Sequence, residues 1–508
     1  MNNKLLSIAL KELHTLQEDG NVFKSADFSG KNMTYLKRAG YLKPIIRGWY
    51  HQSHPADLDG DSTAWYAGYW EFVTKYLHER FGSEYCLNPE MSLLLHTQNS
   101  IIPRQIVVVT KKGAVGNVKL PHDTSIFIYP DKKAFSKESV TVNGLNVYRL
   151  EEALCKVGVS FFRDRQEEIE IALAMVKDVS VLLNILLTRN RMDDASSRIC
   201  GALKFVGRED DAIRIKETYE TATFKTLSLK NPFKKEAVLL KPSRERNPYA
   251  LRLQSMWEKY RAIIVSMEMP RHEKKTSLSV EAIIEEMEEK YQADAYHSLS
   301  IEGYKVSLEL IAKVSSGAWD PVQNPEDKTT INALAAKGYY GAFQAVKKSI
   351  VTCMRNAEEI TEVLHKEHHK WYSELFAPSV QTGILEIQHL AGYRSHQVYL
   401  RGSLHVPFPK SAIVDAMETY FELLAKEEDP VVGAILGHFM FGFIHPYMDG
   451  NGRMARFIMN AILVSHGYPW LIIKVEHRDK YMQSLESASV DADVKPFAAF
   501  VLGYANET

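Results

Sequence analysis

The chain of 508 residues is short of cysteine, of long apolar stretches and of net charge, and each shortage excludes a class of protein. Its four cysteines lie far apart in the sequence, so neither a disulfide framework nor a CxxC metal or redox site is expected. No stretch of about 18 apolar residues occurs, and charged residues interrupt the segment from Met1 to Gly20. The formal net charge of −1 excludes a chain that binds nucleic acid over its whole surface. We therefore expect a cytoplasmic protein with no signal peptide and no membrane association.

The remaining composition is that of an ordinary globular protein, with 45% hydrophobic and 25% charged residues. At roughly 100–200 residues per domain, the length predicts about three domains. Two basic, polar stretches, 241–248 and 270–275, indicate a domain boundary between them. We predict a chain divided as follows: 1–55, 56–235, a linker or connecting helix at 236–276, and 277–508.

The first fifty residues are basic, with eight lysines and arginines against four acidic residues. Apolar spacing predicts a helix before Gly20 and another at Asn32–Ala39, and Tyr41–Tyr50 is typical of two short strands around a turn. Helices followed by a hairpin are the outline of a winged helix-turn-helix, which could place a helix in the major groove of DNA. Its phosphate contacts would come from four basic residues: Lys31, Lys37, Arg38 and Arg47. A small winged helix that contacts only protein is the alternative.

The N-terminal part also carries a family resemblance. Thr34–Leu42, together with Arg47-Gly48-Trp49-Tyr50, resembles the start of antitoxins from abortive-infection systems. Tyr148–Leu154 and the helical sequence after Glu167 resemble the C-terminal part of the same antitoxins. Between these segments, two apolar runs predict strands: Ile106–Thr110 and Ile126–Tyr129. The resemblance implies an N-terminal α/β region that includes the winged helix.

A polar, glycine-rich loop near the C-terminus separates two apolar helices. Val431–Ile444 is apolar nearly all round, as a buried helix should be, and Pro446 predicts its end. Gly450 and Gly452 permit backbone angles and close approaches that a side chain would block. The loop leads into a helix N-terminus, where free N–H groups and the helix dipole favour an anion.

The side chains of this loop are those of a phosphoryl- or nucleotidyl-transfer site. Arg453 and Arg456 can donate paired hydrogen bonds to phosphate oxygens. Asp449 offers the hard oxygen ligands that suit Mg²⁺ bridging phosphates. His445 stands at the edge of the loop, where an imidazole can take a proton from an incoming hydroxyl. Each residue alone is more often an ordinary surface or turn residue, but chance would have to supply every role in order.

The run His445–Arg456 resembles the Fic signature, His-Pro-Phe-x-(Asp/Glu)-Gly-Asn-Gly-Arg-x-x-Arg, with Tyr447 in place of phenylalanine. This resemblance extends over Val280–Gly503 and implies an all-α Fic fold with a small β-hairpin flap. It implies transfer of AMP from ATP, with Mg²⁺, to a Ser, Thr or Tyr hydroxyl of a target protein that the sequence does not name. The implied roles are the base for His445, a Mg²⁺ ligand for Asp449, an anion hole for Gly450, Asn451 and Gly452, a phosphate contact for Arg453 and a γ-phosphate contact for Arg456.

An upstream segment fits a second pattern of the same family. Ser298-Leu299-Ser300-Ile301-Glu302-Gly303 matches the inhibitory pattern (Ser/Thr)-x-x-x-Glu-(Gly/Asn). Ser298 and Glu302 are four residues apart, so they share one helix face. In Fic proteins such a glutamate pairs with the second arginine of the signature, here Arg456. The carboxylate would deny that arginine to the γ-phosphate and repel the nucleotide, so the resemblance implies autoinhibition.

Gly392–Gly402 resembles the β-hairpin flap with which Fic proteins pin an extended target segment by strand addition. The target-docking residues would be Ser395, His396, Gln397, Val398 and Tyr399. The Pro-Pro that usually follows is replaced here by Val406-Pro407-Phe408-Pro409.

Several alternatives stay open at this level. The same pocket could remove AMP from a target, with Glu302 positioning a water molecule, and other nucleotides or phosphocholine are donors within the family. Kinase activity is disfavoured because the glycine and arginine pattern is intact. The N-terminal domain could make the chain a DNA-binding autoregulator, alone or in addition to an enzyme. The sequence also leaves open whether the chain forms a homodimer.

Overall fold

The computed structural model describes most of the chain. The described residues are 3–17, 20–57, 60–132, 135–136, 138–188, 192–236, 238, 247–267, 279–317, 319, 331–390 and 392–505. They form two compact units, one of Met1–Ser255 with Val398–Val406 and the other of Met256–Gln397 with Pro407–Thr508. Within the predicted linker or connecting helix at 236–276, residues 247–267 are described and contain a helix, whereas 241–246 and 270–275 lie outside the described residues.

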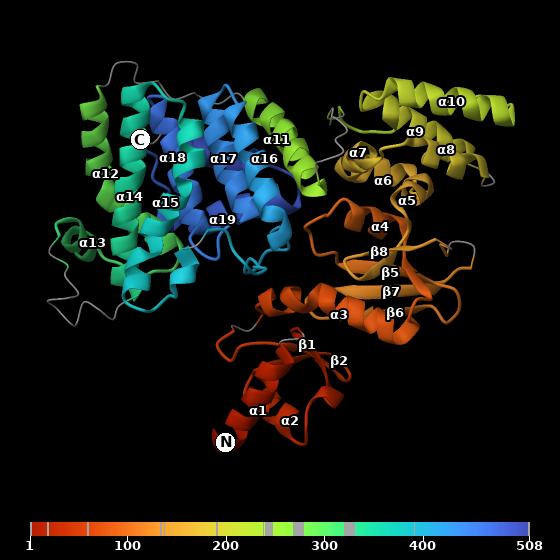
Figure 1. Ribbon diagram of the computed structural model, residues 1–508, viewed down its shortest axis with the longest axis horizontal. Helices are drawn as coiled ribbons and strands as arrows, with labels where there is room; N and C mark the ends of the chain where they lie inside the picture. Colours follow the sequence, from red (N-terminus) through yellow and green to blue (C-terminus); the bar gives the residue numbers. More distant parts are fainter. Residues whose placement is uncertain are drawn as a thin grey trace. The chain divides into compact units, whose positions relative to one another are not determined.

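The first unit begins with two helices beside a small antiparallel sheet (Figure 1). The elements are α1 (Asn3–Leu16), β1 (Val22–Lys24), α2 (Asn32–Arg38), β2 (Leu42–Ile46) and β3 (Trp49–Gln52), and the sheet order is β1-β3-β2. Leu13 of α1 and Leu36 of α2 are buried together with Phe23 of β1 in one apolar cluster. The two helices and the hairpin predicted from the sequence are therefore confirmed.

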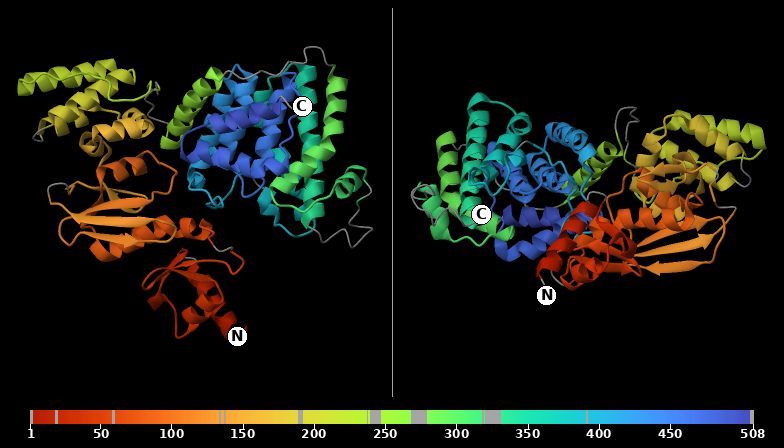
Figure 2. Two further views of the ribbon diagram at one scale, coloured as in Figure 1. Left: turned by 180° about the vertical axis from the view of Figure 1, so that it is seen from behind. Right: turned by 60° about the horizontal axis from the view of Figure 1, so that its bottom comes forward.

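A four-stranded mixed sheet follows, accompanied by two helices, and Figure 2 shows its strands from a second side. Its elements are α3 (Thr63–Phe81), β4 (Tyr85–Leu87), α4 (Pro89–His96), β5 (Gln105–Thr110), β6 (Gly116–Lys119) and β7 (Ser125–Pro130), with the strand order β4-β5-β7-β6. The central strands β5 and β7 are parallel and place Ile106 opposite Ile126, both fully buried against α3. This pair confirms the two predicted strands.

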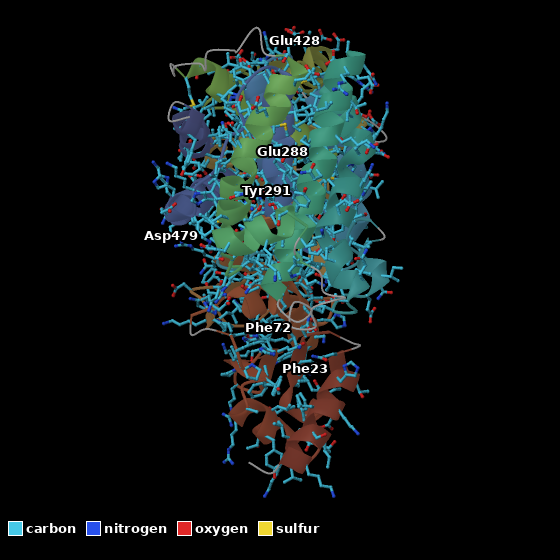
Figure 3. The ribbon with its side chains drawn as sticks, turned by 90° about the vertical axis from the view of Figure 1, so that its left-hand side faces the viewer. Phe23, Phe72, Glu288, Tyr291, Glu428 and Asp479 are labelled. Carbon is cyan, nitrogen blue, oxygen red and sulfur yellow. The ribbon has the colours of Figure 1, made fainter. Side chains whose placement is uncertain are left out.

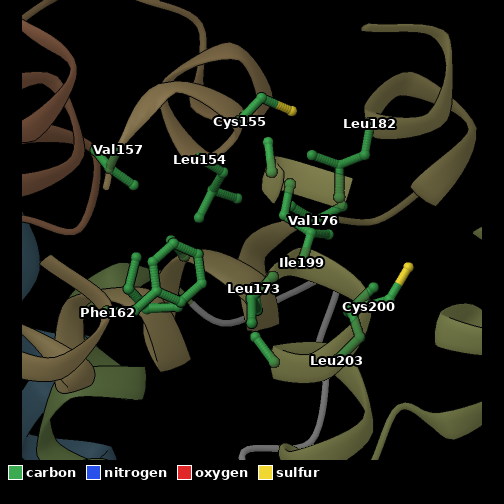
Figure 4. Packing of buried hydrophobic residues seen from close by; sticks show 14 of the residues in the cluster. Leu154, Cys155, Val157, Phe162, Leu173, Val176, Leu182, Ile199, Cys200 and Leu203 are labelled. Atoms are coloured by element: carbon green, nitrogen blue, oxygen red, sulfur yellow. The ribbon is translucent and has the colours of Figure 1, made fainter. Parts of the chain in front are cut away.

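Among the described residues, a short hairpin and a group of six helices follow in the first unit. They are β8 (Val140–Val142), β9 (Leu145–Val147), α5 (Leu150–Lys156), α6 (Val159–Asp164), α7 (Gln166–Met175), α8 (Val179–Thr188), α9 (Asp193–Phe205) and α10 (Glu209–Thr223). Figure 4 shows Leu154, Phe162, Leu173 and Ile199 meeting in the apolar core of these helices. In the described part of the chain no single helix has the length and hydropathy of a membrane span. Helices α7 and α8 have that length and hydropathy only when they are taken together, and the chain bends by 109° between them.

The segment Val398–Val406 is also part of the first unit, although it is distant in sequence. Its residue His405 forms an antiparallel bridge with Ile101. The Ile102 N–H donates to the Leu404 carbonyl at 3.0 Å, and the Val406 N–H donates to the Ser100 carbonyl at 2.7 Å. Residues 398–402 of the predicted flap, including two of its predicted target-docking residues, Val398 and Tyr399, therefore belong to this unit.

The second unit consists of helices packed along one another (Figures 1 and 2). They are α11 (Pro248–Ser266), which begins in the first unit, α12 (Val280–Ile301), α13 (Leu308–Ser315), α14 (Ile331–Asn356), α15 (Ile360–Gln381), α16 (Ile413–Ala425), α17 (Pro430–Ile444), α18 (Asn451–Ser465), α19 (Arg478–Val490) and α20 (Lys495–Ala505). Helix α12 buries Tyr291, whereas Glu288 lies on its exposed side (Figure 3).

The predicted β-hairpin flap is wrong: residues 392–402 are all described and contain no strand. Side chains take the acceptors that a hairpin ladder would need. Arg394 donates from Nη1 to the His396 carbonyl at 2.9 Å, and Gln397 donates from Nε2 to the Pro407 carbonyl at 2.7 Å. The backbone N–H of Arg394 donates to the Pro446 carbonyl at 2.9 Å, which ties the segment to the polar loop instead of to a second strand.

Candidate active site

The polar loop lies between α17 and α18 because local chemistry ends one helix and begins the next. Asp429 caps α17 by accepting the Val431 N–H at 2.9 Å. At the other end His445 adopts a left-handed conformation with φ of +55°, and Pro446 has no N–H to continue the helix. Gly450, with φ of +78°, then turns the chain into the first turn of α18.

Asn451 closes the loop on itself. Its Oδ1 accepts the Tyr447 N–H at 2.9 Å, and its Nδ2 donates to the Tyr447 carbonyl at 2.8 Å. These two bonds are buried, so the side chain holds the backbone of the loop in one shape. The role observed for Asn451 is thus to fix the loop that surrounds the helix N-terminus.

Tyr447, the one departure from the Fic signature, has its own partners. Its ring stacks on Tyr372 with 3.7 Å between ring centroids, and its hydroxyl lies 2.9 Å from Nδ1 of His369. The hydroxyl is therefore satisfied within a buried aromatic cluster, as a buried Tyr O–H requires. The exchange of phenylalanine for tyrosine leaves the loop intact.

His445 is held in the tautomer that a base needs. Its Nδ1 lies 3.2 Å from the Gly442 carbonyl oxygen, which can only accept, so Nδ1 carries the proton. The lone pair is therefore on Nε2. Burial lowers the pKa of His445 to about 4, so the ring is neutral at pH 7 and able to accept a proton.

Arg456 is buried and makes an ion pair with Glu302, in the segment that resembles the family's inhibitory pattern. Its Nη2 donates to Oε1 of Glu302 at 2.6 Å, and its Nε donates to Oγ of Ser298 at 2.9 Å. Although burial opposes it, the charges of Arg456 and then Arg453 lower the pKa of Glu302, which keeps this carboxylate ionised. Within the described residues, Nη1 of Arg456 has no hydrogen-bond acceptor.

The Glu302 carboxylate enters the glycine-rich loop. A Cβ atom built on Gly452 would lie 2.4 Å from Oε1 of Glu302 and 3.3 Å from Nη1 of Arg456. The missing side chain of Gly452 therefore leaves space for a negative group beside the free N–H of Arg456. Gly303, with φ of +88°, lets the chain turn directly after this carboxylate.

Arg453 is fixed by two aromatic rings that belong to none of the sequence motifs. Its guanidinium lies 5.3 Å from the ring centroid of Tyr304 and 5.1 Å from that of Phe376. Its Nη2 also donates to Oδ2 of Asp449 at 3.3 Å. Tyr304 could have been suspected because it follows Gly303 directly, but no sequence signal points to Phe376 on α15.

Asp449 has the open position that a metal ligand needs. Its side chain is 62% exposed, and its Oδ1 accepts the Gly450 N–H at 2.6 Å. The described residues contain no group of three side chains that could hold a metal ion by themselves. A Mg²⁺ ion at Asp449 would therefore need further oxygen ligands from bound phosphate and water, which is how Mg²⁺ commonly binds in nucleotide sites.

The remaining predicted site residues lie outside this loop. Ser395 and His396 are exposed in the second unit, next to Arg394. The four basic residues predicted to contact DNA belong to the first unit, and all four are exposed: Lys31, Lys37, Arg38 and Arg47.

Comparisons with known proteins agree with the resemblance of the polar loop. Residues 363–463 match the model of the Fic/DOC family. Protein adenylyltransferase Fic of Aedes aegypti is 30% identical over 220 residues, which are 42% of this chain and 40% of the relative. The protein of the same name from Nematostella vectensis has the same identity over 220 residues, 42% of this chain and 47% of the relative. The chain thus spans less than half of the length of these curated relatives.

Among solved structures, Fic-1 from C. elegans is 18% identical, covers 70% of this chain and 88% of its own, and has a TM-score of 0.37. The family match includes α17, the polar loop and most of α18. The part of the chain that carries the candidate site is therefore a match to the Fic/DOC family.

Proposed function

We propose that the chain is a protein adenylyltransferase that transfers AMP from ATP to a Ser, Thr or Tyr hydroxyl of a target protein, and that Glu302 restrains it. The observation that carries the proposal is the 2.6 Å ion pair between Glu302 and Arg456 beside the anion-binding loop. A neutral base at His445 and the N-terminus of α18 supply the rest of the machinery.

In the proposed reaction, Nε2 of His445 takes the proton of the target hydroxyl. The hydroxyl oxygen forms a bond to the α-phosphorus, the bond from that phosphorus to the bridging oxygen breaks, and pyrophosphate leaves. Charge that develops on the phosphate oxygens is stabilised by the N–H groups at the start of α18 and by Arg453. Mg²⁺ held by Asp449 would neutralise phosphate charge.

The restraint follows from charge and space. The ionised Glu302 side chain occupies the position beside Arg456 where the γ-phosphate would bind, and it repels the nucleotide. Bound ATP then lacks its contact with Arg456 and lies in an unproductive pose. Release requires the carboxylate to leave the guanidinium.

Label transfer from α-labelled and γ-labelled ATP with Mg²⁺ tests the proposal. We compare the unaltered chain with Glu302→Gly and with Glu302→Gly/His445→Ala. The exposed Glu309 at the start of α13 provides a matched control, Glu309→Gly. We expect only the α label to be transferred to protein. Its transfer should rise by about tenfold or more in Glu302→Gly, disappear when His445 is also replaced, and stay unchanged in the Glu309→Gly control.

The other outcomes identify the alternatives. Transfer of the γ label would show a kinase. Release of label from a previously modified protein, lost in Glu302→Gly, would show removal of AMP. Absence of transfer in every variant would reject the proposed activity.

We also propose that residues 1–55 form a winged helix that binds DNA. In support, α2 directly precedes the β2–β3 hairpin, the sheet order is β1-β3-β2, and the basic residues Lys31, Lys37, Arg38 and Arg47 are exposed. Replacing all four with Gln should reduce the slope of log affinity against log salt by about 3 to 4. Lys112→Gln/Lys119→Gln, on exposed residues of the same unit, is the control. Equal binding by the fourfold variant would reject this surface.

We further propose a cytoplasmic location, and the oligomeric state is open to direct measurement. Sedimentation of the full chain would show whether it forms a homodimer. Fractionation of cells that produce it would test the cytoplasmic location.

A further inference from the structure

Helix α12 and the residue directly after it carry three polar side chains at spacings of four. Ser298 and Glu302 contact Arg456 directly, and Asp294 lies one turn before Ser298. Asp294 is only 4% exposed. A buried carboxylate is costly unless it is paired, so its partners indicate what it does.

Two buried hydrogen bonds, joined by the contact between Tyr339 and Ser298, connect Asp294 with Arg456. Tyr339 of α14 donates its hydroxyl to Oδ2 of Asp294 at 2.6 Å. Ser298, which lies one helical turn after Asp294, interacts electrostatically with the Tyr339 hydroxyl, and Oγ of Ser298 accepts a hydrogen bond from Nε of Arg456 at 2.9 Å. Arg456 donates to Ser298, Tyr339 donates to Asp294, and all four residues are buried.

We propose that Asp294 is a positioning residue which, through Tyr339 and Ser298, holds Arg456 in its nucleotide-binding orientation after Glu302 has withdrawn. The inference rests on the proposed function. While Glu302 is paired, it supplies the negative charge next to the guanidinium. When that carboxylate leaves, the Nε bond to Ser298 persists, and the charge at the end of the chain keeps its donors aligned.

The electrostatic surroundings of Asp294 agree with this role. It faces Tyr339 of α14, Arg456 of α18, Trp470, and Lys290 and Tyr291 of α12 itself. Burial raises the pKa of Asp294 to about 6, against the effects of Tyr339 and Arg456. The carboxylate is therefore ionised at pH 7.5 and loses its charge below pH 6.

The test uses full-length Glu302→Gly and compares it with Glu302→Gly/Asp294→Asn. Calorimetry measures the affinity for Mg²⁺-ATP and for AMP, which has no γ-phosphate. We expect a loss of about tenfold for ATP, because a charge-assisted contact to Arg456 is weakened, and no change beyond about twofold for AMP. The preference for ATP over AMP should also fall more steeply below pH 6 in Glu302→Gly than in the double variant, where only the titration of the nucleotides remains.

Two further variants keep the test decisive. Tyr339→Phe in the Glu302→Gly background retains the ring and removes the hydroxyl that bonds to Asp294, so it should lower the preference for ATP over AMP. It gives the same information if Asp294→Asn fails to fold. Ser349→Ala, at another buried position of α14, should leave the preference unchanged. Equal losses for ATP and AMP, or no loss for either, would overturn the positioning role. Failure of Glu302→Gly itself to bind ATP would reject the proposed function, and this inference with it.

Discussion

Glu302 and Tyr304, separated by one glycine, contact the two arginines of the loop by different forces. Glu302 pairs with Arg456 through a full charge, whereas the ring of Tyr304 lies against the guanidinium of Arg453. A charge competes with phosphate for the same position, but a ring leaves the N–H groups at the edge of the guanidinium available. The segment 298–304 thus pairs with one arginine and orients the other.

We therefore predict that Tyr304→Ala, made in the Glu302→Gly background, weakens ATP binding by about fivefold, since a cation–π contact contributes on the order of 1 kcal/mol. Tyr304→Phe keeps the ring and should bind ATP as the parent does. Titration with a fluorescent ATP analogue measures both. Equal weakening by the two substitutions would assign the effect to the hydroxyl and contradict the role of the ring.

The titration of Asp294 should also change how the free energy of unfolding depends on pH. Burial raises the pKa of its carboxyl from 3.8 to about 6, so its contribution to stability is present below about pH 3.8 and is lost as pH rises through 6. At pH 7.5, Asp294→Asn should therefore be more stable than the parent, by about 1–3 kcal/mol. Urea unfolding at pH 5 and 7.5 measures the free energies. A variant that is less stable by the same amount at both values would contradict the prediction.

At the scale of single residues, the sequence indicated the residues of the signature but not the side chains that position them. His445, Asp449, Arg453 and Arg456 follow one another between positions 445 and 456, in the loop and the start of α18, so their order alone indicates their chemistry. Phe376 and Tyr339 lie on α15 and α14, and only packing brings them to the arginines. No spacing rule connects residues on separate helices.

At the scale of elements, the close crossing of α14 and α15 depends on one glycine. A Cβ atom on Gly338 would lie 1.9 Å from the backbone oxygen of Leu375. Backbone atoms cannot move aside as the end of a flexible side chain can, so any larger residue must separate the helices. Helix α15 carries Phe376 immediately after this contact, which links the crossing to the site.

Gly338→Ala should therefore destabilise the second unit by about 2–4 kcal/mol, because overpacking at a helix crossing forces backbone shifts. Gly503→Ala on α20, where a Cβ would meet no atom of the described residues within 4 Å, should be neutral or slightly stabilising. Thermal melting followed by circular dichroism compares the two. A crossing that tolerated alanine would show similar melting temperatures for both variants.

The helices that flank the loop could be predicted, whereas the segment after Gly392 could not. Helices α17 and α18 have apolar patterns bounded by proline and glycine, which are local signals. The conformation of the segment 392–402 depends instead on Arg394, whose guanidinium donates to the carbonyls of His445 and His396. The alternation of residues in a sequence does not show that a side chain will donate to a backbone carbonyl, such as that of His396, which a hairpin would need for its strand pairing.

For the whole molecule, the division into two units does not follow the order of the chain. Val398–Val406 interrupts the second unit and is part of the first, where Leu404 packs against the core that contains Ile106 and Ile102. Arg401 adds an ion pair to Asp61 with 3.0 Å between the charged atoms. The first unit is therefore complete only when this distant segment is present.

We predict that Leu404→Ala in the full chain loosens the first unit by about 1–2 kcal/mol, the usual cost of truncating a partly buried side chain. Hydrogen exchange with mass spectrometry should detect faster exchange in β4 and β5. Val414→Ala, which removes an exposed side chain of α16, is the control and should change neither unit. Faster exchange confined to α16–α18 would contradict the assignment of this segment.

By itself the sequence determined the chemistry of the loop, the helices on both sides of it and the helical spacing of Ser298 and Glu302. These features are local, because helix ends, glycine turns and one-face spacing depend on residues within a few positions of one another. Only the tertiary structure decided that Glu302 meets Arg456, 154 positions away, that two rings hold Arg453, and that Val398–Val406 joins the first unit. Such contacts arise from the packing of whole elements, which no local pattern in the sequence specifies.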